Sequence, residues 1–390
     1  MRILLASIPC CATLRTHRIG VLRNQAIFNE RLVLEHVGQC VESTPPRPSS
    51  QRTTILSLDS FTPAFINPSY TKDETDRRFM TFFLDNDSKC PDSMVFRKAR
   101  NTANEYCALK SPLFYKGSPE ERLLKASPEE TAHLLRETQK LITLEEYRSS
   151  LAVSHLKGFP KMFGLGKAKD EPVIVREYVE GPTLGASIEA LPRAGTEPCA
   201  GIEPATVASI AKSILKALLN AQSLDGSFIH RDLSPRNIVF RTDKRSLQEQ
   251  IDSNQYDVCL VDLGSSSYVE ANDPFATAQY GIWRFGTIEY APPEMLTRDV
   301  EGVDEMRHSE TIDTYALCSI MHLLLTLRTP YRLAARINDS PYLVKTKEQT
   351  LTRSDPSACE LLKLANRGIA PKQEDRFTVS ELYDELGKFA

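Results

Sequence analysis

Short runs of apolar and aromatic residues dominate the part of the chain that follows residue 77, and longer runs with helical spacing fill its second half. Runs of this length, bounded by turn residues, predict strands near 79–84, 94–99, 105–109, 159–165 and 172–178. Ser127-Pro128-Glu129-Glu130 is a typical helix start, so a long helix is expected to continue to about residue 152. Further helices are expected near 184–191, 204–222, 311–327, 356–367 and 378–388.

The order of these elements predicts an α+β fold with two lobes. A small lobe, built on an antiparallel sheet with one long helix, is expected at about 77–179, and a larger, mainly helical lobe at about 180–390. Residues 1–76 show no sustained periodicity and contain the proline-rich run Ser43–Ser50. We therefore expect 1–76 to be an N-terminal extension whose structure the sequence does not define.

Composition is that of a globular protein rather than a disordered or fibrous one. The 390 residues are 41% hydrophobic and 25% charged, and the formal net charge of -3 gives no reason to expect a nucleic-acid partner. Nine cysteines without a C-x-x-C pair indicate a reduced, cytoplasmic protein. No run approaches the roughly 20 apolar residues of a membrane helix, so no membrane partner is expected.

The strongest functional signal lies in the run from Phe228 to Phe240, FIHRDLSPRNIVF, where Asp232 precedes Asn237 by five residues. A short apolar run after it ends in Asp262-Leu263-Gly264. These two segments resemble the catalytic loop and the metal-binding triplet of protein kinases. Three later segments also resemble that family in the same order, namely Gly286–Glu294, Asp313–Cys318 and Glu374–Thr378.

The resemblance to serine/threonine protein kinases implies an enzyme that transfers a phosphoryl group from ATP to a protein substrate, with Mg2+ as cofactor. Asp232 would be the catalytic base, and Asn237 and Asp262 would bind the metal. Thr287 would contact Asp232, and Arg376 would pair with Glu294. Two departures from the family pattern concern the phosphates: Ser234 stands where a lysine is usual, and Arg236 would take over its role. Serine and cysteine occupy the usual glycine positions of the phosphate loop, at Ser88, Cys90 and Ser93.

The same resemblance assigns nucleotide-binding residues in the small lobe. Lys110 would bind the phosphates and pair with a helix glutamate, for which Glu146 is preferred and Glu137 is the alternative. The base would lie between Val95, Ala108 and Val239, and the backbone of Glu177 and Val179 would hydrogen-bond it. Arg176 would lie at the rear of this pocket, where a cation needs a partner or solvent.

Two other functions remain open. A nucleotide-binding pseudokinase acting as a scaffold would explain Ser234 and the absence of glycine between residues 88 and 93. A small-molecule phosphotransferase would share the Asp232-to-Asn237 spacing, but the segment Gly286–Glu294 is typical of kinases that dock a polypeptide.

Overall fold

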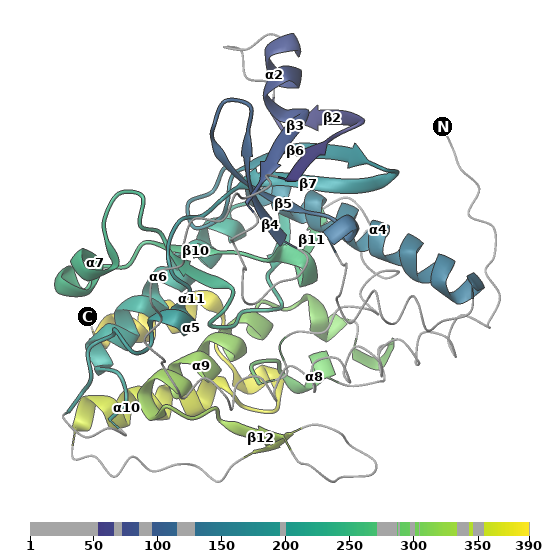
Figure 1. Cartoon of the computed structure of the whole chain (residues 1–390). Helices are drawn as coiled ribbons and strands as arrows, with labels where there is room; N and C mark the ends of the chain where they lie inside the picture. The colour runs from purple at the N-terminus through teal and green to yellow at the C-terminus, as the bar shows by residue number, and fades with distance from the viewer. Residues whose placement is uncertain are drawn as a thin grey trace.

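The computed structural model describes residues 54–65, 72–85, 96–114, 129–195, 200–270, 287, 289–296, 301–303, 305–333, 343–345 and 355–389. Its two lobes are stacked, with the sheet of the small lobe above the helices of the large lobe (Figure 1). The predicted bilobal α+β fold is confirmed. In the described ranges, no helix is both long and apolar enough to cross a membrane.

The small-lobe sheet has the strand order β1-β3-β4-β5-β7-β6-β2, and all its pairs are antiparallel. Its hydrophobic core includes the buried residues Phe82, Leu109 and Val175. The five expected strands are all present with bounds shifted by a few residues. The strands are β1 (Thr54–Ser57), β2 (Ser60–Pro63), β3 (Thr81–Leu84), β4 (Phe96–Asn101), β5 (Tyr106–Lys110), β6 (Met162–Ala168) and β7 (Glu171–Glu177).

Residues 54–63, which we call the N-terminal strap, join the two edges of this sheet. The first half, β1, pairs with β3, and the second half, β2, pairs with β6. The switch occurs within two residues, because the Leu58 amide donates to Met80 O at 2.9 Å and the Asp59 amide donates to Lys167 O at 2.7 Å. The two edges must therefore curl toward each other. The folded sheet thus includes residues that we had expected to lie in an N-terminal extension.

Two glycines in β6 make room for the strap. A Cβ atom at Gly166 would overlap with Leu58 Cδ1, and a Cβ atom at Gly164 would overlap with the ring of Phe61 and with Thr62 O. Glycine has no Cβ, so another backbone can approach closely at both positions. Leu58 is 5% exposed and belongs to the small-lobe core.

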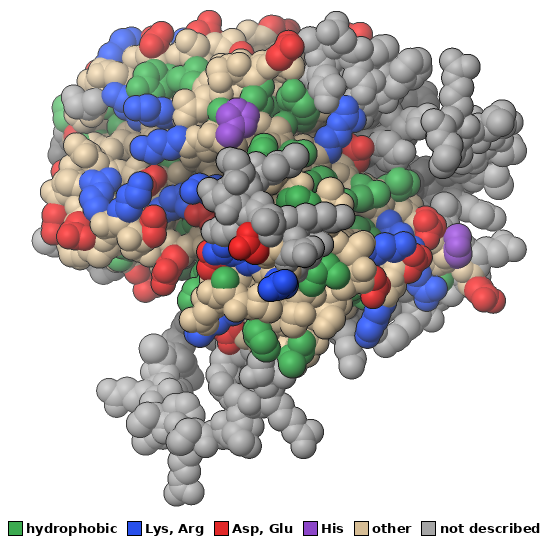
Figure 2. Space-filling view, turned by 90° about the horizontal axis from the view of Figure 1, so that it is seen from above, with side chains coloured by type: hydrophobic (Ala, Val, Ile, Leu, Met, Phe, Trp, Pro, Cys, Tyr) green, Lys and Arg blue, Asp and Glu red, His purple; other side chains and the backbone are tan. Residues whose placement is uncertain are grey.

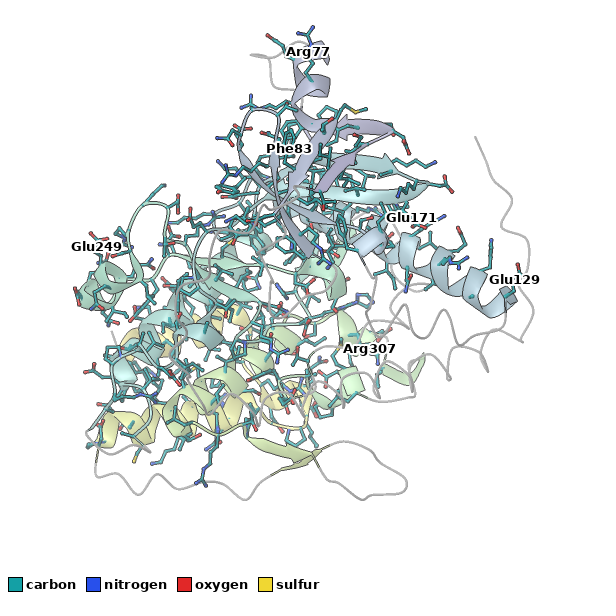
Figure 3. The ribbon with its side chains drawn as sticks, viewed as in Figure 1. Arg77, Phe83, Glu129, Glu171, Glu249 and Arg307 are labelled. Carbon is teal, nitrogen blue, oxygen red and sulfur yellow. The ribbon has the colours of Figure 1, made fainter. Side chains whose placement is uncertain are left out.

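The long helix α4 (Glu129–Val153) is the expected one and lies beside the sheet, with its first residue, Glu129, at the outer end (Figures 1 and 3). It packs on β7 and on the short turn of 3-10 helix at Leu263–Ser265. Because this turn follows Asp262, α4 links the small lobe to one of the predicted metal ligands.

The large lobe is built around α6 and α9, which are buried along most of their length. Proline at the first position of α6 and Asp355 before α10, which caps two backbone amides, explain where these helices begin. Segment 184–191 is helical only at its start. Besides α4, the α-helices within the described ranges are α2 (Lys72–Phe79) in the small lobe and, in the large lobe, α5 (Leu184–Ser187), α6 (Pro204–Gln222), α7 (Leu247–Ser253), α8 (Pro293–Leu296), α9 (Thr311–Thr326), α10 (Pro356–Gly368) and α11 (Val379–Leu386).

In the described part of the chain, three small two-stranded sheets accompany these helices. They pair β8 (Gly226–Ile229) with β11 (Ser267–Glu270), β9 (Ile238–Phe240) with β10 (Val258–Leu260), and β12 (Tyr331–Leu333) with β13 (Leu343–Lys345). The loop after β8 contains Asp232, and the loop after β10 contains Asp262, which contacts Lys110 of the small lobe. Seen from above, positive and negative side chains are interspersed over the described surface (Figure 2).

Candidate active site

Asp232 lies in the loop between β8 and β9, and its carboxylate is held from two directions. Oδ1 accepts hydrogen bonds from the backbone amide and the hydroxyl of Thr287, both at 2.7 Å. The Asn237 side-chain amide donates to Asp232 O at 2.8 Å and to Oδ2 at 3.2 Å. The expected contact between Thr287 and the predicted catalytic base is therefore present. These bonds fix the direction of the carboxylate.

The start of this loop is anchored on α9 by Asp313. The backbone amides of His230 and Arg231 donate to the two oxygens of Asp313, at 2.8 and 2.9 Å. Arg231 adopts a φ of 64°, a left-handed conformation that is uncommon for a residue with a side chain. The two bonds to Asp313 hold this turn, so Asp313 positions the residue directly before Asp232.

Burial perturbs both titratable groups at the anchor. His230 is fully buried, and desolvation lowers its pKa to about 4, so the imidazole is neutral near pH 7. Desolvation also raises the pKa of Asp313 to about 6, although the bonds from the two amides oppose this shift. The anchor thus combines a neutral imidazole, whose Nε2 lies 3.2 Å from Val261 O, with a carboxylate that ionises near pH 6.

Arg231 points into the large lobe. Its guanidinium donates to Arg307 O at 2.8 Å and lies 3.0 Å from His308 Nδ1, and the residue is 4% exposed. Arg307, labelled in Figure 3, is also buried and donates to Glu294 O at 2.9 Å. In this arrangement the guanidinium of Arg231 is used inside the protein, where it joins the loop that contains Asp232, through Arg307, to the segment around Glu294.

Glu294 and Arg376 form the expected buried pair. The guanidinium binds both carboxylate oxygens, at 2.5 and 3.0 Å, and the two side chains are 1% and 0% exposed. Arg376 also donates to Ala370 O and Pro371 O, each at 2.8 Å, so four of the five N–H donors of the guanidinium are used. A bidentate pair with these extra bonds compensates well for desolvation. It fixes the end of the segment that contains Thr287.

Asp262 follows β10 and meets the small lobe through Lys110. Lys110 Nζ lies 2.6 Å from Asp262 Oδ1 and 2.7 Å from Glu146 Oε2, so one ammonium joins two carboxylates. The charge of Lys110 lowers the pKa of Asp262 well below its usual range. Burial acts to lower the pKa of Lys110, but the two carboxylates outweigh it and the net shift is upward. A Cβ at Gly264 would come within 3.4 Å of all three charged groups, so glycine leaves them room.

The structure pairs Lys110 with Glu146 and not with Glu137. Glu146 is buried, with its side chain 2% exposed, whereas the Glu137 side chain is 49% exposed and lies 3.1 Å from Lys140. Nine residues of helix are about two and a half turns, so the two glutamates project from opposite sides of α4. Only the side that carries Glu146 meets the sheet at Lys110.

One face of the sheet, which we call the Lys110 face, carries the other candidate nucleotide contacts. Phe96 lies opposite Lys110, and Ala108 lies opposite Arg176, and residues directly opposite in an antiparallel pair share a face. Val95, the predicted contact for the base, lies outside the described residues, as do Ser88, Cys90 and Ser93. Phe96 is the first residue of β4 and shares a face with Lys110. The sequence analysis did not identify it.

Arg176 is almost completely buried on the same face. Its residue exposure is 7%, its Nη1 lies 3.8 Å from Glu146 Oε1, and its guanidinium carbon lies 5.6 Å from the centre of the Phe96 ring. The partner that a cation needs at this position is therefore Glu146. From the large lobe, Val239 is also buried, at 6% exposure, and forms an isolated bridge with Thr183.

The strand that leads to Val179 is tied to the large lobe by its preceding glutamate. Arg241, just after β9, contacts both oxygens of Glu177 at 2.5 and 3.2 Å, and it also donates to Phe159 O at 3.1 Å. The Lys161 amide donates to Glu177 Oε2 at 2.9 Å. The side chain of Glu177 is thus occupied, and its backbone amide donates to Lys161 O at 2.8 Å, so its carbonyl is the group to consider for a ligand. Arg241 was not identified from the sequence.

Ser234 and Arg236 have opposite environments. Ser234 is 1% exposed, and its hydroxyl has no hydrogen-bond partner in the described part of the chain. Arg236 is exposed. Position 234 therefore lacks a cation, and the nearest cation along the loop is Arg236, whose side chain is exposed to solvent.

Asn237 and Asp262 provide a donor set that fits magnesium. In the described ranges there is no cluster of three or more His, Cys, Asp or Glu residues that would form an all-protein metal cage. The Asn237 amide nitrogen donates to Asp232, which leaves its oxygen to accept, and the pKa of Asp262 keeps that carboxylate ionised. The Val261 amide donates to Asn237 O at 2.9 Å, so the two side chains come from adjacent backbone segments. Two hard oxygen ligands, completed by water and phosphate, are typical of magnesium sites.

Comparisons with known proteins agree with this geometry. The family model for the protein kinase domain matches residues 93–386. A protein of Mycoplasma pneumoniae is 31% identical over 170 residues, which are 42% of this chain and 38% of that protein. A protein of Mycoplasma genitalium is 27% identical over 232 residues, which are 56% of this chain and 54% of that protein. Both are named "Putative serine/threonine-protein kinase", and the match spans about half of their length or less. With three quarters of its length matched by the family model, this chain belongs to the protein kinase domain family.

Proposed function

We propose that this protein transfers the γ-phosphate of ATP to serine or threonine hydroxyls of a protein substrate. The observation that carries the proposal is the restraint of Asp232 by Thr287 and Asn237. The backbone of Asn237 is hydrogen-bonded to Val261, the residue before a second carboxylate, Asp262, that is paired with Lys110. Phosphoryl transfer depends on positioning and on charge compensation more than on covalent chemistry. The residues brought together between the lobes meet both needs.

Asp232 would accept the proton of the attacking hydroxyl as the oxygen approaches the phosphorus. Its bonds to Thr287 keep one carboxylate oxygen fixed, so the approach of a hydroxyl does not require the side chain to rotate. Thr287 belongs to the segment whose resemblance is to kinases acting on serine and threonine. Arg236, exposed four residues after Asp232, would reach the phosphate oxygens in place of a cation at Ser234.

The nucleotide would bind on the Lys110 face. Lys110 would keep its bond to Glu146 and exchange its bond to Asp262 for one to the phosphates, while the base would lie against Ala108, Val239 and the predicted contact Val95. The backbone of Glu177 and Val179 would hydrogen-bond the base. Magnesium held by Asn237 and Asp262 would neutralise charge on the phosphates. We further propose a cytoplasmic location, which the free thiols of Cys107, Cys259, Cys318 and Cys359 support.

Phosphate transfer from labelled ATP to a generic protein substrate tests this function. Wild type is compared with Asp232→Asn and with the control Asp225→Asn, which changes an exposed carboxylate seven residues earlier. Loss of a general base lowers the rate by about 100-fold or more, and we expect that loss only for Asp232→Asn. Equal labelling by wild type and Asp232→Asn would refute the kinase assignment.

A second candidate, a nucleotide-binding scaffold without catalysis, is favoured by one observation. The buried hydroxyl of Ser234 replaces a cation next to the proposed site of transfer. Binding of a fluorescent ATP analogue with magnesium separates the two functions. A scaffold would bind the analogue in wild type and would show no labelling above that of Asp232→Asn, whereas the proposed kinase would show both binding and labelling.

A further inference from the structure

We propose that Arg176 is a positioning residue for nucleotide binding, because Arg176 and Lys110 hold Glu146 between them and thereby fix α4 against the sheet. The inference rests on the proposed nucleotide-binding function and adds Arg176, on β7, to the residues that support it. Glu146 is then restrained by a pair of cations and not by Lys110 alone.

The register of the sheet brings the two cations to the same carboxylate. Lys110 ends β5, and Arg176 lies on the neighbouring strand β7, opposite Ala108. Since Ala108 and Lys110 are two residues apart on one strand, Arg176 shares their face. Glu146 projects from α4 toward this face and lies 2.7 Å from Lys110 and 3.8 Å from Arg176.

The two oxygens of Glu146 are treated differently. Oε2 binds Lys110, whereas Oε1 is buried and has no hydrogen-bond partner within the described ranges. Arg176 Nη1 faces Oε1 at a distance too long for a hydrogen bond but within the range of an ion pair. A buried carboxylate is costly without such compensation. Arg176 supplies the charge that the second oxygen lacks.

The charges around Lys110 show why a second cation matters for a nucleotide. Lys110 is shared between Glu146 and Asp262 at nearly equal distances. A phosphate would be a third anion for the same ammonium. Arg176 continues to hold Glu146 when Lys110 turns toward the phosphate, and it keeps the cluster of Lys110, Arg176, Glu146 and Asp262 neutral. Without Arg176, Glu146 would have Lys110 as its one cation among the described side chains and would compete with the phosphate for that ammonium.

The experiment measures the affinity for a fluorescent ATP analogue in magnesium buffer, by titration, in the full-length protein. The variants are Arg176→Met, which keeps an apolar stem of similar length, Arg176→Lys, Glu146→Gln, and Arg176→Met with Glu146→Gln. Lys167→Met serves as a control, since Lys167 is a half-exposed cation in the neighbouring strand β6. Far-UV circular dichroism and urea midpoints identify variants that are folded.

We expect Arg176→Met to weaken nucleotide binding about tenfold, and Arg176→Lys, which keeps the charge, to weaken it less. In the Glu146→Gln background, the change at 176 should have little further effect, because its target is already neutral. Lys167→Met should bind as wild type does. This coupling between Arg176 and Glu146 is what a purely structural role for Arg176 would not produce.

Three outcomes would count against the inference. Unchanged affinity in Arg176→Met would overturn it, and so would equal losses from Arg176→Met in the wild-type and Glu146→Gln backgrounds. If Arg176→Met does not fold, Arg176→Lys is measured alone and together with Glu146→Gln, and equal losses of affinity from Arg176→Lys in the two backgrounds would overturn the inference. Wild type that binds no nucleotide refutes the proposed function itself, whereas wild type that binds but does not transfer phosphate refutes only the catalytic part.

Discussion

Leu58 gives a direct test of the N-terminal strap as part of the folded small lobe. It is 5% exposed and sits where the strap changes from pairing with β3 to pairing with β6. Leu58→Ala removes buried methyl groups in a place where the backbone on both sides is fixed by hydrogen bonds. Substitutions of this kind cost about 2–5 kcal/mol, and we expect a loss of about 3 kcal/mol in the free energy of unfolding.

Urea denaturation followed by circular dichroism measures this loss, and Ile55→Ala is the matched control. Ile55 lies in the same strap but is 59% exposed, so its loss should remain below about 0.5 kcal/mol. A strap that is not packed on the sheet in solution would give similar, small losses for both variants. That result would refute the reasoning.

Gly166 sharpens the test, because its clash with Leu58 can be removed. Gly166→Ala places a methyl group on Leu58 Cδ1 and should cost about 1–3 kcal/mol. In the Leu58→Ala background that methyl group has space, with Ser60 O as the nearest remaining neighbour at 3.2 Å. The loss of stability in the double variant should therefore be smaller than the sum of the losses in the two single variants. Simple additivity would show that the two residues are not in contact.

Two further predictions concern buried charges in the large lobe. Arg376→Met leaves Glu294 buried without its partner and should lower the free energy of unfolding by about 3–5 kcal/mol, whereas the exposed Lys388→Met should change it by less than about 0.5 kcal/mol. The second prediction concerns pH between about 4 and 6. The lowered pKa of His230 makes stability fall as the pH falls, whereas the raised pKa of Asp313 makes it fall as the pH rises, so the two effects oppose each other. In Asp313→Asn only the His230 effect remains, and urea denaturation should show a steeper loss of stability toward pH 4, by up to about 1.4 kcal/mol per pH unit. An unchanged slope, or equal losses in Arg376→Met and Lys388→Met, would contradict the respective prediction.

Local patterns predicted the large lobe well. The helix expected at 204–222 has those bounds, and the helix expected at 311–327 ends one residue earlier. Apolar spacing and helix-start residues are both local signals, so no knowledge of packing was needed. The capping box that starts α7, Ser246 with Glu249, is equally local and could have been found in the same way.

Features that depend on pairing between distant segments were harder to predict. The strap has no sequence signal of its own, because its strands are four residues long and find their partners at two different edges of the sheet. The strap requires glycine at positions 164 and 166, but this requirement can be recognised only once the strap is known to lie against them. Strands this short are specified by their neighbours and not by their own residues.

The register of the hairpin between β4 and β5 explains why Phe96 was missed. The tight turn at Asn101–Glu105 pairs Phe96 with Lys110, and a shift of one residue exchanges the two faces of a strand. The prediction of Val95, made by counting back from Lys110 with the family's spacing, lies outside the described residues and stays a prediction. Counting did identify Glu146 as the glutamate that contacts Lys110, since a helix fixes the direction of its side chains through its own period.

The strap also bears on where this protein can be divided. Residues 54–63, 72–79 and 81–84 form ordered elements before residue 93, where the match to the family model begins. A fragment cut at residue 93 would lose β1, β2 and β3, and would leave the hydrogen-bonding edges of β4 and β6 uncovered. Uncovered edges of this kind invite pairing with other chains. Recombinant fragments for enzymology should therefore begin before residue 54, even though the recognisable family resemblance begins some forty residues later.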